Sequence, residues 1–337
     1  MAVQDPLSPL PKLASIAREA GVSVATVSKA LNGRADVSAR TRQLIAEVLE
    51  RRGHSWQRPR TARGSLVDVM LQGLGSAYAL AILEGVEEAA WQLGVDLVVS
   101  AVVGRTKHGQ PPPAWLDRLG ARDSAGVLLV RTMPTATQRA WLADHDIPAV
   151  VVEPRAAVPR GLPVVAATNV AGARAATEHL IGLGHERIAI VTGRPGVPCA
   201  KERRAGYRKA MAVAGLKIDP RWEICGYFQM DDALQAARAM LGELPEPPTA
   251  VFACSDAMAL GVYQALGEHG LRVPGDVSVV GFDDSLAAAY ATPGLTTVRQ
   301  PWPELGAAGL AALLADRPPA RVEVPTALVV RSSTAPA

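Results

Sequence analysis

After the first 65 residues, short apolar runs alternate with amphipathic segments, and this alternation restricts the possible folds more than any other feature. Residues 66–71 and 126–130 have the length and composition of buried strands, whereas residues 78–93 and 171–183 carry apolar side chains at helical spacing. Alternating strands and helices predict parallel sheets with helices on both faces. Because the pattern restarts after Pro163, we expect two doubly wound halves with a ligand cleft between them, at the carboxyl ends of the strands.

The same pattern predicts further elements on both sides of Pro163. They are strands at 97–103, 149–152, 164–167, 188–191, 250–253 and 277–282, and helices at 135–145, 205–214 and 258–269.

The first part of the chain has a different pattern, that of three short helices. Gly21 permits a tight turn after the first helix, and Ser23 occupies the N-cap position of a second helix over residues 24–31. Ser38 then caps a third helix with one apolar stripe. Two helices packed through a short glycine-containing turn predict a helix-turn-helix, whose second helix enters the major groove of DNA. A helical hairpin that only packs on a neighbouring domain is the alternative.

The charge distribution favours DNA binding by this module. Residues 1–63 hold eleven Lys or Arg against five Asp or Glu, although the whole chain carries only +3. A basic first segment on a mildly acidic body indicates a polyanionic partner for that segment alone. Short hydroxyl and amide side chains at a helix N-terminus are suited to phosphate oxygens. The polar row of the second helix is Ser23, Thr26, Ser28, Lys29 and Asn32.

Residues 20–33, AGVSVATVSKALNG, closely resemble the headpiece of the lactose-repressor (LacI/GalR) family, and the match continues through residues 37–42. The resemblance implies that Val24, Ala25 and Lys29 read bases, with apolar contact from the first two and donation to guanine O6 and N7 from Lys29. It also implies that Ser23, Thr26, Ser28 and Asn32 hold phosphates or cap helices.

The linker after the headpiece departs from the family pattern, in which a short helix inserts a Leu into the minor groove. Residues 53–65 are several residues shorter than usual, Pro59 disfavours a helix, and no Leu precedes Ala62-Arg63. We therefore expect an extended basic hinge in which Arg58, Arg60 and Arg63 reach phosphates or a narrow minor groove. A solvated tether without DNA contacts is the alternative.

The resemblance also covers the body, almost to Ser333. Its most specific segments are Thr168-Asn169, residues 179–180, 184–189, 203–207, 255–261, 273–284 and 295–301. It implies an all-α helix-turn-helix headpiece followed by an α/β body of the periplasmic-binding-protein type, with two doubly wound parallel-sheet subdomains and chain crossings near Thr168, Gln300 and Pro325. The expected boundaries are 10–55 for the headpiece, 56–65 for the hinge and 66–333 for the body. Within the body, the N-subdomain takes 66–167 and 301–324, and the C-subdomain takes 168–299 and 326–333.

Read residue by residue, the resemblance implies an effector site between the two subdomains. A sugar offers hydroxyl pairs and an apolar ring face, so its site needs a carboxylate, a guanidinium and aromatic side chains. The implied site residues are Tyr78, Glu153, Arg203, Phe228, Ser255, Asp283 and Trp302.

Each of these residues also has a purely structural interpretation. Phe228 and Trp302 could be ordinary core or surface aromatics, and Arg203 could pair with a structural acid. Asp283 could cap a turn, and Ser255 could be only the N-cap of the following helix.

The remaining sequence features argue against other classes of protein. Cys199, Cys225 and Cys254 form no C-x-x-C pair, so we expect no metal site, no disulfide framework and no cofactor. No apolar run reaches the roughly 20 residues of a membrane helix, and the first residues do not resemble a signal peptide. We therefore expect a cytoplasmic protein. Because the sequence also contains no nucleophile elbow and no phosphate loop, we expect that it is not an enzyme.

Together these features predict a transcription regulator, most simply a repressor, whose effector is a small molecule and by the resemblance a sugar. A single headpiece buries too little surface for tight specific binding, so we expect a homodimer on a two-fold symmetric operator, with residues 81–92 at its interface. A non-sugar effector, or a vestigial ligand site on a DNA-binding protein, is the alternative.

Replacing Arg58, Arg60 and Arg63 together by Ala tests the hinge hypothesis. We expect weaker operator binding and a flatter dependence of the logarithm of affinity on salt, because each phosphate contact contributes to that slope. Fluorescence anisotropy at several salt concentrations measures both quantities. An unchanged affinity and slope would show that the segment is only a tether.

Overall fold

The structure is a computed structural model that describes residues 13–31, 37–52, 66–102, 110–122, 124–243 and 246–337. The first described part is the predicted three-helix headpiece: α1 (Leu13–Glu19), α2 (Val24–Leu31) and α3 (Ala39–Arg51). Buried residues such as Ile16, Val27, Ile45 and Leu49 from all three helices form its core. The predicted hinge, residues 56–65, lies outside the described residues.

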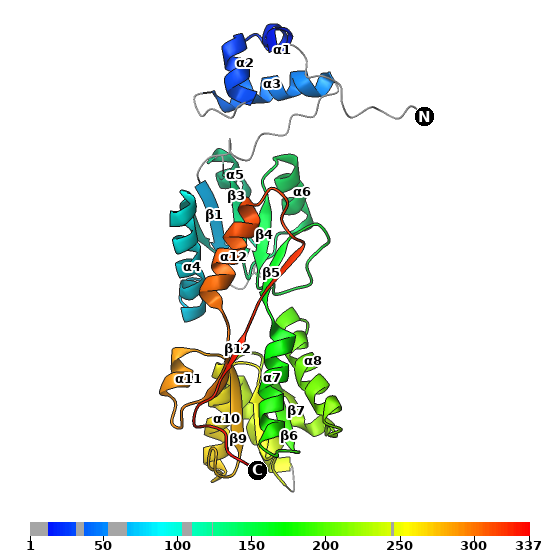
Figure 1. The fold of residues 1–337 in the computed structure, drawn as a ribbon, viewed down its shortest axis with the longest axis vertical. Coiled ribbons are helices and arrows are strands. Elements are labelled where there is room, and N and C mark those ends of the chain that lie inside the picture. Colours follow the sequence, from blue (N-terminus) through cyan, green and yellow to red (C-terminus); the bar gives the residue numbers. More distant parts are fainter. Residues whose placement is uncertain (1–12, 32–36, 53–65, 103–109, 123, 244–245) are drawn as a thin grey trace, which may run out of the picture.

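The body contains two six-stranded sheets, each covered by helices on both faces (Figure 1), as the alternating pattern predicts. The first sheet has the strand order β11-β5-β4-β3-β1-β2 and every pairing in it is parallel. Its strands are β1 (Leu66–Leu71), β2 (Asp96–Ala101), β3 (Gly126–Val130), β4 (Ala149–Val152), β5 (Val164–Ala167) and β11 (Arg321–Val324). Its helices are α4 (Ala77–Leu93), α5 (Ala114–Ala121), α6 (Ala136–Asp144) and α12 (Trp302–Leu314). We call this unit the first subdomain.

The second subdomain repeats this plan with the strand order β12-β10-β9-β8-β6-β7. Its pairings are parallel except that β12 runs antiparallel to β10. The strands are β6 (Ile188–Thr192), β7 (Glu223–Cys225), β8 (Ala250–Ala253), β9 (Ser278–Asp283), β10 (Thr296–Arg299) and β12 (Ala327–Val329). The helices are α7 (Asn169–Gly182), α8 (Pro198–Val213), α9 (Met230–Glu243), α10 (Asp256–Glu268) and the short α11 (Leu286–Tyr290), with a 3-10 turn at Pro220–Trp222.

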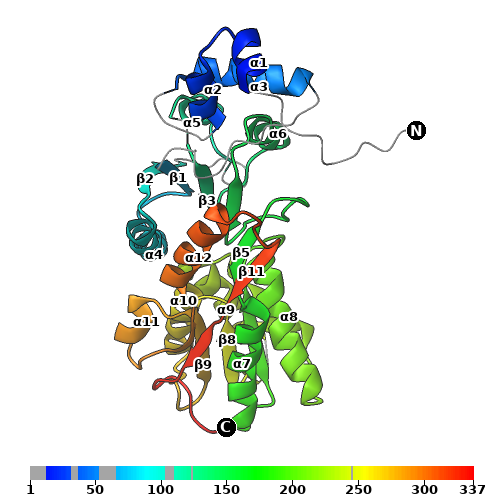
Figure 2. The same cartoon turned by 45° about the horizontal axis from the view of Figure 1, so that its top comes forward.

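The chain passes between the two subdomains three times, after β5, after β10 and after β11. In Figure 2, β11 and β12 follow one another from the first sheet to the second. The first and third passages are joined by hydrogen bonds, since the Thr326 backbone N–H donates to Thr168 Oγ1 at 2.9 Å and the two threonine hydroxyls lie 3.0 Å apart. These passages orient the two sheets with a cleft between their carboxyl-terminal edges.

Alternate residues of the central strands supply two separate apolar cores on the two faces of the first sheet. Val67, Val69 and Leu71 of β1 face the core beneath α4 and α12, whereas Met70 faces the core beneath α5 and α6. This assignment follows from the two-residue period of a strand. Strands buried on both faces explain the nearly continuous apolar runs in the sequence.

Neighbouring helices approach so closely that glycine is required at their contacts. A Cβ atom on Gly261 of α10 would lie 2.3 Å from the Met230 carbonyl oxygen at the start of α9. Gly306 of α12 meets the Ile82 carbonyl oxygen of α4 in the same way, at 2.2 Å. In both places the backbone of one helix occupies the space of a side chain on the other.

The observed elements differ from the predicted ones in a few places. Helix α8 begins at Pro198, seven residues before the predicted start at 205. Its first turns bury Cys199, Ala200 and Arg203. A search for periodic apolar residues misses these turns because Arg203 is charged. The pattern also missed α5, α9, α11, α12, β7 and β10–β12. Strand β11 alternates polar and apolar side chains at a sheet edge, which weakens its signal. Among the described residues, no helix is long and apolar enough to cross a membrane.

Gly261→Ala tests the close helix contact. We expect a loss of about 1–3 kcal/mol in the free energy of unfolding, because the added methyl forces α9 and α10 apart. Gly267→Ala in the same helix has no atom within 4 Å of the added Cβ and provides the matched control, with an expected change between zero and a gain of about 1 kcal/mol. Urea denaturation of both variants measures the difference, and equal stabilities would refute the contact argument.

Candidate functional site

The second helix of the headpiece is fixed at its N-terminus by the predicted cap. Ser23 Oγ accepts a hydrogen bond from the Thr26 backbone N–H at 3.0 Å, and the Ser23 and Thr26 hydroxyls lie 2.7 Å apart. The turn before it contains Gly21 at a φ of +63°, a conformation that favours glycine. Ser38 caps α3 in the same way, through the Thr41 backbone N–H at 3.1 Å. These caps set the direction in which α2 presents its side chains.

Helix α2 exposes the residues that are expected to contact bases. Val24, Ala25 and Lys29 are exposed, whereas Val27 and Ala30 are buried in the headpiece core. Ser28 lies half-buried on the same helix. Of the other expected DNA-binding residues, Asn32, Arg58, Arg60 and Arg63 lie outside the described residues.

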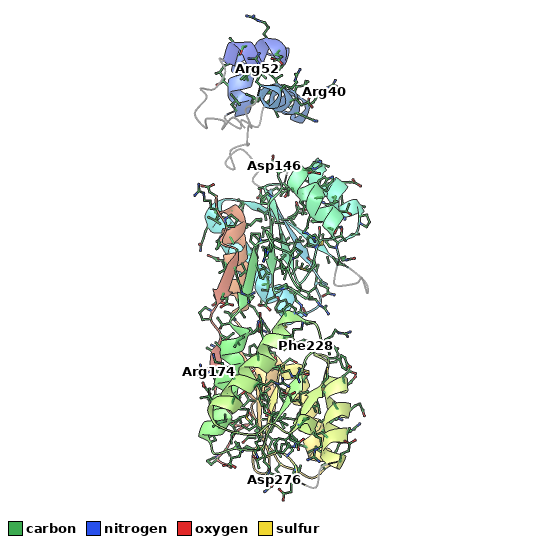
Figure 3. The ribbon with its side chains drawn as sticks, turned by 90° about the vertical axis from the view of Figure 1, so that its right-hand side faces the viewer. Arg40, Arg52, Asp146, Arg174, Phe228 and Asp276 are labelled. Carbon is green, nitrogen blue, oxygen red and sulfur yellow. The ribbon has the colours of Figure 1, made fainter. Side chains whose placement is uncertain are left out.

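The end of α3 is bound to α1, which closes the headpiece. Arg52 donates from Nε and Nη2 to Glu19 Oε2 at 2.9 and 2.6 Å, and from Nη1 to Ser15 Oγ at 2.8 Å. Figure 3 shows Arg52 together with Arg40, which lies at the other end of α3. Two hydrogen bonds from one guanidinium to the same carboxylate fix the orientation of α3 relative to α1 more firmly than a single surface ion pair would.

A cavity of about 870 Å³ lies between the two subdomains, at the carboxyl ends of their strands. Figure 3 shows Phe228, one of its lining residues, at the level where the two subdomains meet. Six of the seven expected effector residues line this cavity: Tyr78, Arg203, Phe228, Ser255, Asp283 and Trp302. Its volume is that of a typical small-molecule site.

Residues with left-handed backbone conformations gather at the carboxyl ends of strands that border this cavity, and three of them, Arg131, Phe228 and Asp283, line it. Such conformations are uncommon in residues other than glycine, and they concentrate at functional sites because the surrounding structure must hold them in place. The residues concerned are Arg131, Glu153, Tyr227, Phe228, Asp283 and Asp284, with φ between 50° and 135°. All six lie at or just after the carboxyl ends of β3, β4, β7 and β9.

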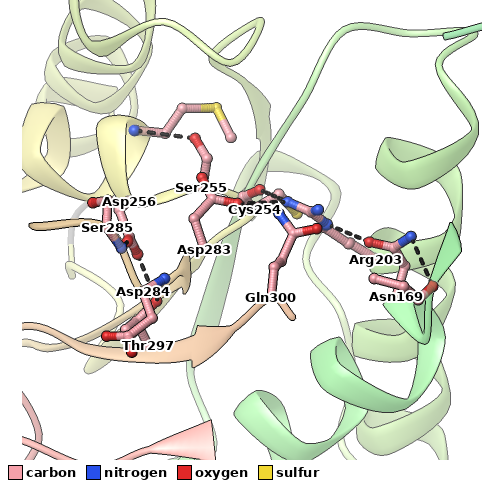
Figure 4. A network of polar contacts seen from close by, with 12 residues as sticks. Asn169, Arg203, Cys254, Ser255, Asp256, Asp283, Asp284, Ser285, Thr297 and Gln300 are labelled. Atoms are coloured by element: carbon pink, nitrogen blue, oxygen red, sulfur yellow. Dashed lines mark hydrogen bonds and ion pairs between the residues drawn. The ribbon is translucent and has the colours of Figure 1, made fainter. Parts of the chain in front are cut away.

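Arg203 forms the floor of the cavity on the side of the second subdomain. Its side chain is only 3% exposed, and Nε donates to Asn169 Oδ1 at 2.9 Å while Nη1 donates to the Cys254 carbonyl oxygen at 2.7 Å (Figure 4). Nη1 also lies 3.5 Å from Asp283 Oδ1, and the guanidinium carbon lies 3.7 Å from the centre of the Phe282 ring. Arg203 is thus held by structural partners and also faces the ligand space.

Asp283 supplies the carboxylate beside Arg203. Gln300 Nε2 donates to its Oδ1 at 2.6 Å. Burial raises the pKa of the Asp283 carboxyl to about 7, although the positive charge of Arg203 favours the ionised form. Asp283 therefore changes its charge close to neutral pH.

The loop after Asp283 is fixed by Asp256, which stands at the start of α10. Asp256 Oδ2 accepts from the Ser285 backbone N–H at 2.7 Å, and Oδ1 accepts from Thr297 Oγ1 at 2.5 Å (Figure 4). Ser255 caps α10, since its Oγ accepts from the Met258 backbone N–H at 3.3 Å. Ser255 therefore has the structural role that the sequence allows, and it lines the cavity as well.

Aromatic rings form two walls of the cavity. The Tyr78 and Trp302 rings meet edge to face, with centres 5.5 Å apart and an angle of 80° between their planes. Phe228 comes from the other subdomain and packs where Gly193 has no side chain, since a Cβ on Gly193 would lie 2.0 Å from Phe228 Cζ. These rings can cover the apolar face of a ligand from both sides of the cleft.

Glu153 lies apart from the cavity lining. Its side chain is buried, and Oε1 accepts from the Ala167 backbone N–H at 2.6 Å, which connects the end of β4 with the end of β5. Burial also raises the pKa of Glu153. The structure thus gives Glu153 an anchoring position behind the wall, different from the direct lining position expected from the sequence.

Several lining residues were not identified from the sequence. Gln72, Arg131, Arg155 and Gln300 all line the cavity. Arg131 directly follows the predicted strand 126–130, and Arg155 lies three residues after the predicted strand 149–152. Both positions are at the carboxyl ends of strands, the edge where ligands bind in such sheets. That position in the sequence was the signal that could have identified them. No cluster of metal-ligating side chains occurs among the described residues.

Two protein-family models match parts of this chain. A model described as "Bacterial regulatory proteins, lacI family" matches residues 12–55, and a periplasmic binding protein-like domain matches residues 177–334. The ribose operon repressor of Escherichia coli K12 is 32% identical over 298 residues, covering 86% of this chain and 88% of that protein.

Two solved structures match nearly the whole chain. The transcriptional regulator CelR in complex with cellobiose has a TM-score of 0.69 and 32% identity, covering 96% of this chain and 99% of that one. The lac repressor dimer bound to operator and an anti-inducer has a TM-score of 0.68 and 28% identity, with the same coverage.

Proposed function

The chain belongs to the LacI family of bacterial regulatory proteins, and on this premise we propose that it is a repressor controlled by a sugar. It is a DNA-binding transcriptional regulator whose operator affinity responds to a small-molecule effector. The identity of the effector as a sugar is our proposal. It is supported by the ribose and cellobiose named for two of the similar proteins and by the chemistry of the cleft.

The observation that carries the sugar proposal is the pairing of Arg203 and Asp283 beside aromatic walls. A guanidinium donates and a carboxylate accepts, so together they can bind neighbouring hydroxyls of a sugar. Gln300 extends this polar edge, and its Oε1 has no hydrogen-bond partner among the described residues. The Trp302 and Phe228 rings offer apolar surface to the ring of the sugar.

We propose a homodimer that places two headpieces on a two-fold symmetric operator. Helices α4 and α11 lie on the same side of the body in Figures 1 and 2. Leu80 and Trp91 on α4 are 61% and 85% exposed, and Leu286 and Tyr290 on α11 are 71% and 82% exposed. Large apolar side chains exposed on one side of the body favour a protein interface there, and the similar lac repressor is a dimer bound to its operator.

The proposed mechanism is a shift between two arrangements of the subdomains. A ligand that contacts both walls favours the closed arrangement because only that arrangement makes both sets of contacts. Closure moves one subdomain of each protomer and so alters the separation of the headpieces. In this scheme the protein acts in the cytoplasm, where operator DNA is found, and by binding without catalysis, in keeping with relatives that are named as repressors.

Selection of DNA from a random pool by the purified protein tests the DNA-binding part of the proposal. We expect a two-fold symmetric motif. Lys29→Ala should then lower the affinity for that motif about 5- to 150-fold, because one base contact contributes about 1–3 kcal/mol, while non-specific binding changes little.

The matched control is Lys209→Ala, an exposed lysine of α8 in the second subdomain, which should bind the motif like the wild type. Equal losses for both lysines would show a general charge effect and would argue against base recognition by Lys29.

The pH dependence of sugar binding tests the role of Asp283. Only the ionised carboxylate accepts hydrogen bonds on both oxygens, so affinity for a neutral sugar should fall as the pH decreases through about 7, the pKa of Asp283. Asp283→Asn should bind weakly and independently of pH. Calorimetric titration at constant ionic strength measures both profiles, and a flat wild-type profile would contradict the proposed contact.

A further inference from the structure

The cavity wall contributed by the first subdomain carries two arginines that the sugar proposal does not use. Arg131 follows β3 directly, and Arg155 lies three residues after β4. Because β3 and β4 are hydrogen-bonded neighbours, with Val130 opposite Val152, both arginines emerge from the same edge of the sheet. Both line the cavity.

Among the described residues, neither arginine forms a salt bridge with a carboxylate. Arg131 lies over the Tyr78 ring, with its guanidinium carbon 5.3 Å from the ring centre, and makes no ion pair there with another described side chain. Arg155 donates from Nη1 to the neutral amide of Gln72. By contrast, Arg203 on the opposite wall has Asp283 at 3.5 Å.

The two arginines also affect one another. Burial, and after it the positive charges of Arg131 and Arg194, lowers the pKa of Arg155. Like charges held together in a partly buried place are unfavourable until an anion compensates them. Such an arrangement is typical of a site that binds phosphate.

The charges of the whole lining agree with this interpretation. Arg131, Arg155 and Arg203 line the cavity with one carboxylate, that of Asp283, which leaves two positive charges. Behind the wall, Glu153 accepts a hydrogen bond from the Ala167 backbone N–H, and burial raises the pKa of its carboxyl, which favours the neutral form. A phosphate monoester carries about −1.5 to −2 charges near neutral pH and so matches the excess.

We propose that the effector is a phosphorylated sugar, whose phosphate is bound by Arg131 and Arg155 and whose hydroxyls are bound by Arg203 and Asp283. This inference rests on the proposed function and deepens it. The phosphate would meet the first subdomain and the sugar ring the second. One ligand would then contact both walls at once, and it could do so only when the cleft is closed. Recognition of the phosphate is thereby coupled to closure of the cleft.

Inorganic phosphate is the first probe, because it needs no knowledge of the sugar. We expect millimolar phosphate to raise the Tm of the full-length protein, whereas chloride at the same ionic strength does not. Arg131→Gln and Arg155→Gln, singly and together, should remove this shift. Arg160→Gln is the matched control, since Arg160 is an exposed arginine close in sequence to Arg155 and does not line this cavity.

The second measurement compares neutral sugars, their phosphate esters and the corresponding uronic acids by calorimetric titration. We expect one phosphate ester to bind at least about 10-fold more tightly than its parent sugar, and Arg131→Gln/Arg155→Gln to abolish that preference while the parent sugar still binds. Circular dichroism of the variants confirms that they fold.

The outcomes separate the two proposals. A phosphate shift that survives in the double variant, a parent sugar that binds as tightly as its ester, or a preference for the uronic acid would overturn the phosphate inference and leave the sugar proposal intact. Operator binding that no sugar or sugar phosphate affects, together with no phosphate shift, would overturn both.

Discussion

One buried guanidinium group links three elements of the second subdomain at the edge of the cleft. A charge removed from water must be compensated by hydrogen bonds or by an opposite charge, and Arg203 obtains this from Asn169, Cys254 and Asp283. These partners belong to α7, to the end of β8 and to the end of β9, which are far apart in the sequence. Arg203 therefore connects these elements, and its position beside Asp283 places a donor and an acceptor side by side at the cleft. In this region the same interaction links elements of the fold and supplies the proposed ligand-binding groups.

The parts of this structure that follow a local rule could be predicted from the sequence. The helix ends of the headpiece could be predicted from Ser23, Ser38 and Gly21, because capping and left-handed turns depend on a few neighbouring residues. The central strands could be located for the same reason, since a strand that is buried on both faces must be apolar throughout. Arg203 and Asp283 were found only through the resemblance to a known family.

The parts that depend on contacts distant in the sequence could not be predicted. The start of α8 was missed because the prediction relied on regularly spaced apolar residues, and Arg203 is charged. Its hydrogen-bond partners nevertheless allow Arg203 to be buried in the first turns of the helix. Glu153 was expected in the cavity, yet its carboxylate turns to the Ala167 backbone, and no local pattern reveals which way a side chain turns at the end of a strand. Arg131 and Arg155 become significant only once β3 and β4 are known to be neighbours. Strand order is information that a periodic pattern does not contain.

The three passages between the subdomains limit how the body can move. Two of them are joined to each other by the hydrogen bonds between Thr168 and Thr326, which hold these two passages side by side. A bend of the subdomains about an axis through the passages leaves these hydrogen bonds intact. In the proposed two-state mechanism, ligands of different length in the same cavity would favour the closed arrangement to different extents. A partial agonist and a full agonist of such a regulator then differ only in their dimensions, through the fraction of the protein that each of them closes.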